Sequence, residues 1–174
     1  MKESNGSIVT LHNLLDYDAH KFTSAEIQLK HALMSWINTA SSFKLKTMLQ
    51  KYLDFVEEHI QKIEKIIIEE DIKSMSVTNK IMKAFIEETA DKIDTCKDSE
   101  VKDACLLASV QTINHYKISM YGTAAAFAKE LGMDKIATLF HTSEVVEKQI
   151  DDRLSQLAEH EINKKAKNAI LLHS

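Results

Sequence analysis

The stretch "EVKDACLLASVQTINHYKISMYGTAAAFAKELG" (residues 100–132) decides the fold class of this chain. It contains no proline and combines small, apolar and charged residues in a way that is typical of a long α-helix. Gly132 stands where helices often end in a left-handed residue. The spacing predicts one helix over roughly 100–130, which spans on the order of 45 Å at 1.5 Å per residue.

The remaining composition extends this prediction to the whole chain. The 174 residues include three glycines and no proline, and sheet-rich folds need turns that draw on both residue types. The chain is 44% hydrophobic and 28% charged, which is ordinary for a folded domain. We therefore expect an all-α protein with a single domain over residues 1–174.

Apolar spacing divides the chain into five predicted helices. They cover roughly residues 9–39, 42–70, 76–95, 100–130 and 134–162. Four of them have matched lengths and one apolar stripe each, which is the pattern of a four-helix bundle. The long link between the second and fourth segments contains the short helix. This arrangement predicts a ferritin-like four-helix bundle with an extra short helix in the crossover between bundle helices two and three.

Charge and composition exclude several classes of function. The net charge of −4 argues against nucleic-acid binding, which requires a basic surface. We interpret the Lys-rich tail "NKKAKNAILLHS" (163–174) as a solvated helix end. No apolar run approaches the 18 residues of a membrane span, and no signal-peptide pattern opens the chain. A cytoplasmic location without a membrane partner is therefore expected.

The two cysteines and the serines suggest no catalytic site. Cys96 and Cys105 do not have metal-ligand spacing. We expect both to be reduced thiols and Cys105 to be a small buried hydrophobe. There is no glycine-framed nucleophile elbow and no Gly-rich phosphate loop, so a non-enzymatic role is favoured.

Polar residues interrupt the apolar stripes near the middle of the long helices. The candidates are Glu26, His59, His115 and Glu147, one from each predicted bundle helix. In a bundle, inward side chains at similar depth can meet, and carboxylates with imidazoles suit zinc or iron. Each residue alone is also compatible with ordinary packing. Two buried glutamates would nevertheless need a partner, because buried unpaired carboxylates are unfavourable.

Several stretches together resemble the YciF-like proteins, a bacterial ferritin-like family linked to stress responses. The similar segments are residues 100–132 with "LHNLL" (11–15), "AEIQLKHAL" (25–33), "IMKAFIEE" (81–88) and "EKQIDDRLSQLA" (147–158). The resemblance implies a ferritin-like bundle that is often dimeric. It also implies a two-metal carboxylate site, with iron as the expected metal and ligands from four helices.

The ligand positions that the resemblance implies are only partly kept. Glu26 and Glu147 are present. Where the family has "EHYE", this chain has Asn114 and Lys117 in place of the two glutamates, and Phe55 stands at an expected helix-two ligand. A di-iron site needs several anionic oxygens to balance its charge, so these changes predict that the di-metal site is largely lost.

Three hypotheses follow from these residues. The first is a metal-free structural or interaction protein, a homodimer by resemblance, in which Lys117 pairs with Glu26 or Glu147. The second is a metalloprotein with a remodelled site for iron, manganese or zinc and an oxidase or storage role. Its ligands would be Glu26, His59, His115 and Glu147. The third is a helical module that binds a partner through a groove or through the helix over 76–95.

Overall fold

The fold was analysed in a computed structural model, which describes residues 8–69 and 77–169. Its elements are α1 (Leu11–Thr39), α2 (Phe43–Glu69), α3 (Lys80–Thr95), α4 (Ser99–Glu130), α5 (Asp134–Leu157), a π-helical turn η1 (Ala158–Ile162) and α6 (Asn163–Ala169). The described residues contain no strand. The all-α prediction is therefore confirmed.

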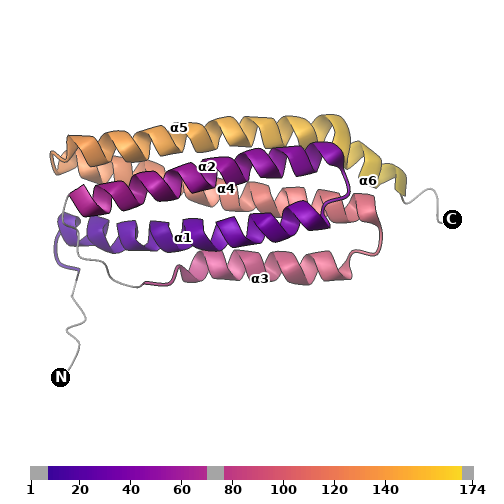
Figure 1. Cartoon of the computed structure of the whole chain (residues 1–174), viewed down its shortest axis with the longest axis horizontal. Coiled ribbons are helices and arrows are strands. Elements are labelled where there is room, and N and C mark those ends of the chain that lie inside the picture. Colours follow the sequence, from indigo (N-terminus) through magenta and orange to yellow (C-terminus); the bar gives the residue numbers. More distant parts are fainter. Residues whose placement is uncertain (1–7, 70–76, 170–174) are drawn as a thin grey trace, which may run out of the picture.

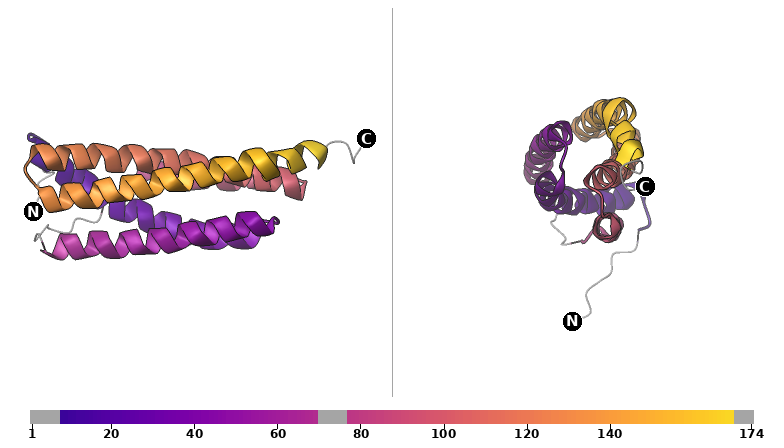
Figure 2. Two further views of the ribbon diagram at one scale, coloured as in Figure 1. Left: turned by 90° about the horizontal axis from the view of Figure 1, so that it is seen from above. Right: turned by 90° about the vertical axis from the view of Figure 1, so that its right-hand side faces the viewer.

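Four long helices surround a common core, and α3 lies outside them (Figure 1). Helix α1 packs against α2, and α4 packs against α5. The end-on view in Figure 2 shows these four helices in a ring, with α3 on its outer side. Helix α3 contacts α1 and α4. The chain thus passes from α2 to α4 along the outside of the bundle, and α2 and α4 run in the same direction.

Local hydrogen bonds fix both ends of α4, and Gly132 ends the helix as predicted. Asp98 caps α4, where its Oδ1 accepts hydrogen bonds from the backbone N–H groups of Glu100 and Val101 at 2.8 and 3.0 Å. At the other end Gly132 has φ 71°, and the N–H of Met133 donates to the carbonyl of Ala128 at 2.9 Å. This is the Schellman closure that glycine permits without strain.

Two helix bounds differ clearly from the predicted ones. The predicted end of the second helix at residue 70 and the predicted start of the third at residue 76 lie outside the described residues. Within the described residues, α3 starts only at Lys80. The predicted fifth helix ends at 162, whereas the α-helical part ends at Leu157 and continues as η1. The tail then forms α6, with exposed lysines on it, as expected for a solvated helix end.

The apolar core is divided into two clusters by a polar layer. One cluster includes Leu29, Leu49, Val110 and Ile150, among other residues. The second lies toward the other end of the bundle and is built from residues such as Leu15, Phe22, Ile63, Tyr121 and Phe140. On every long helix the change from one cluster to the other occurs near the middle. The residues at this change are polar, and they form the site described below.

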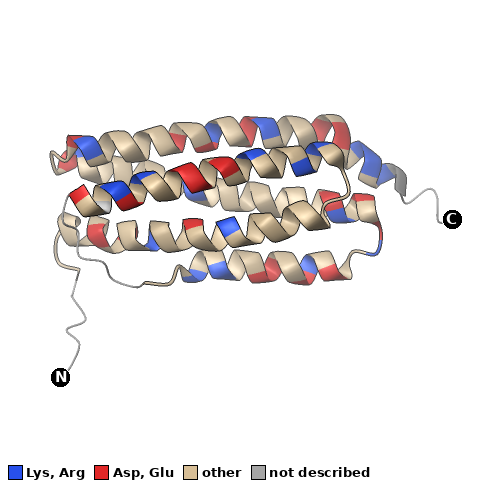
Figure 3. Cartoon of the chain, viewed as in Figure 1, with Lys and Arg blue, Asp and Glu red and all other residues tan. Residues whose placement is uncertain are grey.

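Basic and acidic residues are interspersed along the helices in the view of Figure 3. Among the described helices, none has the length and apolar character needed to cross a membrane.

Asn79 fixes the start of α3 on the bundle. Its Oδ1 accepts from the N–H of Met82 at 2.9 Å and so caps the helix. Its Nδ2 donates to the carbonyl of Lys21 at 3.2 Å and to the Tyr116 hydroxyl at 3.1 Å. Its own N–H donates to Ser24 Oγ at 3.0 Å. One buried side chain therefore links α3 to both α1 and α4.

Replacing Asn79 with alanine is expected to reduce the free energy of unfolding by about 2–3 kcal/mol. The change removes a helix cap and leaves buried polar partners unsatisfied. Urea unfolding would measure it. The matched control is Thr10→Ala, because Thr10 caps α1 with an exposed bond to Asn13 N–H at 3.0 Å and should lose about 1 kcal/mol or less. Equal losses in the two variants would contradict the proposed link.

Candidate functional site

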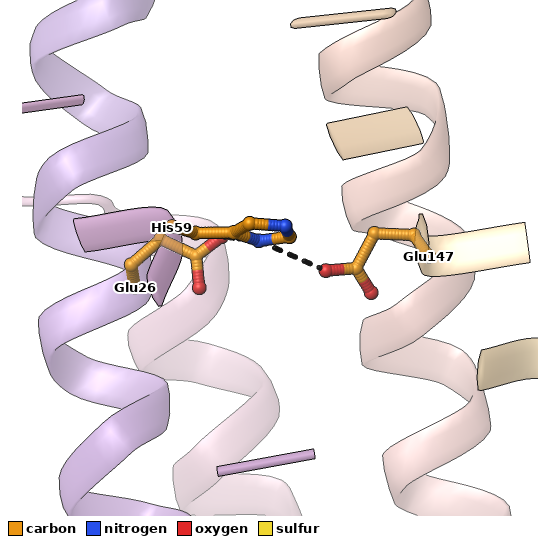
Figure 4. A group of neighbouring side chains, drawn as sticks. All are labelled: Glu26, His59 and Glu147. Carbon is orange, nitrogen blue, oxygen red and sulfur yellow. Dashed lines mark ion pairs between the residues drawn. The ribbon is translucent and has the colours of Figure 1, made fainter. Parts of the chain in front are cut away.

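The polar layer brings together one ionisable side chain from each long helix. Glu26 on α1, His59 on α2, Lys117 on α4 and Glu147 on α5 are all buried, and three of them have no exposed surface. Figure 4 shows Glu26 and His59 facing Glu147 across the bundle. The imidazole Nδ1 lies 3.6 Å from Glu26 Oε1 and 3.5 Å from Glu147 Oε1. We call this group the central cluster.

The Lys117 ammonium lies between the two carboxylates. Its Nζ is 3.0 Å from Glu26 Oε2 and 2.6 Å from Glu147 Oε1. Neither contact has the angles of a well-aligned hydrogen bond, so the attraction is mainly one of charge. The same Nζ lies 4.9 Å from the centre of the Tyr52 ring, a cation–π distance. The predicted pairing of Lys117 is therefore confirmed, and it involves both glutamates.

Neutral hydrogen-bond donors satisfy the other carboxylate oxygens. Glu147 Oε2 accepts from the Tyr52 hydroxyl at 2.8 Å and from Asn114 Nδ2 at 2.7 Å. Asn114 Nδ2 also lies 3.0 Å from the carbonyl oxygen of Glu147. Glu26 Oε1 accepts a short hydrogen bond from the Tyr121 hydroxyl. One oxygen of each carboxylate thus accepts hydrogen bonds from neutral side chains of this chain.

The pKa shifts in the cluster follow from burial and pairing. Burial alone would raise the pKa of Glu26, but Lys117, His59 and Tyr121 together lower it to about 2. Burial would lower the pKa of Lys117, yet Glu147 and Glu26 raise it above 10.5. The pKa values of Tyr52 and Tyr121 are raised well above 10, by burial first and then by the carboxylates. At neutral pH the glutamate and the lysine are charged and both phenols are neutral.

Acid is expected to remove the stability that Glu26 contributes. A carboxyl whose folded pKa is lowered stabilises the protein above its ordinary pKa and loses this effect as the pH falls through the folded value. The window therefore runs from about pH 4.5 down to about pH 2, and the contribution at neutral pH is about 3 kcal/mol. Urea unfolding of the wild type and of Glu26→Gln across this window would measure it. A difference between the two proteins that did not shrink toward about pH 2 would contradict this assignment.

His115 is not part of the cluster, contrary to the sequence prediction. Its side chain is 66% exposed, and Nε2 lies 2.9 Å from Asp151 Oδ1 on α5. The inner face of α4 carries Val110, Asn114, Lys117 and Tyr121. The predicted inward position at His115 was therefore wrong by one residue along the helix. Apolar residues on α4 face α1, α3 and α5, so hydrophobicity alone does not define a single stripe on this helix.

The other predicted positions have mixed outcomes. Phe55 is partly buried and packs against the apolar core. Tyr52 on the same helix is fully buried in the cluster. Sequence reasoning missed the role of Tyr121. The signal was present, because Asn114, Lys117 and Tyr121 are separated by three and four residues and therefore share one helix face.

The residues of the cluster do not fit the two-metal site that the resemblance implies. The cluster offers two carboxylates and one imidazole, but the Lys117 cation lies between the carboxylates. One oxygen of each carboxylate also accepts hydrogen bonds from tyrosine or asparagine side chains. Two metal ions would need more anionic oxygens and no ammonium group at this place.

Comparison with known proteins gives a consistent result. Residues 10–167 match a family model described as a domain of unknown function, DUF892. Protein YciF of Escherichia coli strain K12 is 35% identical over 146 residues, which cover 83% of this chain and 88% of YciF.

Two solved structures are also similar. The crystal structure of the E. coli stress protein YciF has a TM-score of 0.85 and 31% identity, covering 90% of this chain and 99% of that one. YcfI from Rhodopseudomonas palustris has a TM-score of 0.83 and 28% identity, covering 88% and 98%. The chain therefore has the YciF fold and belongs to the DUF892 family of YciF-like proteins.

Proposed function

We propose that this chain is a ferritin-like bundle of the stress-associated YciF type in which a lysine has replaced the metal ions. In this role it acts as a structural or interaction protein without enzymatic activity. The observation that carries the proposal is the buried Lys117 ammonium between Glu26 and Glu147. The association with stress rests on the description of the similar E. coli protein.

Charge balance supports this proposal. Glu26 and Glu147 lie in a site with no exposed surface, and the Lys117 ammonium provides a positive charge between their carboxyl groups. A metal ion would have to displace this cation or be placed against it, and like charges at such short range repel strongly in a buried site. The internal cation thus lowers the affinity of the site for external ones.

A second candidate has one specific observation in its favour. Ligand atoms of Glu26, His59 and Glu147 lie within 4.8 Å of one another. If Lys117 moved away, this set could bind a single iron, manganese or zinc ion, because mixed carboxylate and imidazole ligands suit these metals. Oxidase or storage activity would then be conceivable for this chain.

Elemental analysis distinguishes the two candidates. Protein purified without chelators and then exposed to ferrous iron, manganese or zinc is expected to contain far less than one ion per chain. Its melting temperature should be unchanged, because an ion bound only by the folded state would raise it. Near-stoichiometric metal that is lost in His59→Asn would overturn the proposal and support the single-ion site.

A homodimer is the assembly that we propose for the chain. The resemblance implies it, and two-fold dimers are the commonest oligomers. Sedimentation equilibrium of the purified protein would give the mass directly, and a monomer at micromolar concentration would contradict the dimer.

A further inference from the structure

Helices α3 and α4 form an antiparallel pair whose contacts fix their register. The two helices are joined by the short link over residues 96–98. Their rings meet at Phe85 and Tyr116, with centres 5.5 Å apart and planes at 65°. Asn79 at the start of α3 also hydrogen-bonds to Tyr116. One face of α3 therefore lies against the face of α4 that carries Tyr116.

This register places the two cysteines opposite each other. Cys96 follows Phe85 in the chain by as many residues as Cys105 precedes Tyr116. This separation corresponds to about three helical turns. Both steps lead toward the shared turn, so each cysteine lies on the contacting face of its helix. The raised pKa of the Cys105 thiol, to which Cys96 contributes, is consistent with this proximity.

The two thiols are also accessible. Both are free and only partly buried. This overturns the expectation that Cys105 is a buried hydrophobe, because the α4 face near the turn is only partly covered by the end of α3. Burial raises the pKa of the Cys105 thiol, and the neighbouring Cys96 raises it further. A raised pKa disfavours the Cys105 thiolate, so we assign the first attack to Cys96.

We propose that Cys96 and Cys105 form a dithiol that reacts with hydroperoxides and closes to a disulfide between the end of α3 and α4. The Cys96 thiolate attacks the peroxide O–O bond, which gives a sulfenic acid and hydroxide. The Cys105 thiol then attacks that sulfur, the S–S bond forms and water leaves. In total, two thiols and one hydrogen peroxide give one disulfide and two waters. The reaction needs no metal and is independent of the central cluster.

The geometry favours closure inside one chain. A disulfide needs its two Cα atoms a few ångströms apart, and a contact across a packed helix pair meets this condition with little movement. The bond would fasten the C-terminal end of α3, whose N-terminal end is already held by Asn79. Oxidation would thus fix α3 to the bundle at both ends.

Peroxide titration of the reduced full-length protein tests the proposal. One equivalent of hydrogen peroxide should remove both titratable thiols and reduce the mass by two hydrogen atoms. Trypsin cuts after lysine, so the cysteines fall in residues 93–97 and 103–117. These two peptides should appear joined, and dithiothreitol should separate them. Cys105→Ser should instead give a sulfenic acid at Cys96 that dimedone traps.

A displaced thiol is the matched control. Cys105→Ala combined with Ala104→Cys keeps two partly buried cysteines but turns one of them by about 100° around α4. This variant should form at least tenfold less of the intramolecular link than the wild type. The proposal fails if the wild type forms mainly links between chains or sulfinic acids. It also fails if the displaced thiol closes equally well.

Discussion

Replacing Lys117 with methionine is expected to reduce the free energy of unfolding by about 3–5 kcal/mol at neutral pH. Methionine keeps most of the side-chain volume but removes the lysine charge between Glu26 and Glu147. Breaking a buried pair in this way is strongly destabilising, because it leaves uncompensated charge in a site with no exposed surface. Urea unfolding followed by circular dichroism would measure the loss.

The loss should depend on pH in a defined direction. Without Lys117, burial raises the pKa of at least one glutamate above its ordinary value. Such a group favours the folded state below the ordinary pKa and loses this effect as the pH rises through the raised value. The difference between Lys117→Met and the wild type should therefore shrink as the pH falls toward about 5.

Two further variants test whether the buried charge causes this loss. Lys148→Met removes a lysine whose Nζ lies 2.6 Å from Glu144 but which is 58% exposed, so its effect should stay within about 0.5 kcal/mol. Adding Glu147→Gln to Lys117→Met should restore part of the lost stability, because one buried charge is then removed. A loss below about 1 kcal/mol for Lys117→Met would show that the buried ion pair is not what stabilises this layer.

Helical periodicity predicted the all-α bundle and three of the four residues of the central cluster for physical reasons that can be named. Glu26 and Glu147 were found because each lies in a clear apolar stripe on an amphipathic helix. His59 was found in the same way on α2. These three helices each bury one face, so a period of 3.6 residues places the inward positions correctly.

Helix α4 was harder to interpret because it is apolar on several sides. The inward position on this helix was predicted at His115, whereas the buried face runs through Asn114, Lys117 and Tyr121. Gly122, next to this face, lies beside the Glu144 carboxylate, which a Cβ at this position would approach to 3.1 Å. A lysine and an asparagine on the inner face contradict hydrophobic patterning. Only the resemblance, which places two glutamates there, pointed to Lys117.

Restoring both glutamates on α4 is expected to create metal binding. Asn114→Glu with Lys117→Glu would give four carboxylates and His59 in the central cluster, and it would remove the internal cation. Without metal this variant should be much less stable than the wild type, because four buried carboxylates repel one another. Manganese or zinc at about a hundred times its dissociation constant should then stabilise it by about 2.7 kcal/mol. Calorimetric titration and thermal unfolding would measure both effects.

The glutamine pair Asn114→Gln with Lys117→Gln is the matched control, because it has the same size but adds no carboxylate. It should bind no metal, and equal binding by both pairs would show that α4 does not determine affinity. If the glutamate pair folds but binds no metal, then α2 is also responsible. Tyr52 would be the first residue to change there, because its hydroxyl occupies Glu147 Oε2. Tyr52→His, added to the glutamate pair, would free that oxygen and add an imidazole. Metal binding that appears only in this triple variant would mean that residues on both α2 and α4 had to differ from the metal-binding form before Lys117 could replace the metal ions.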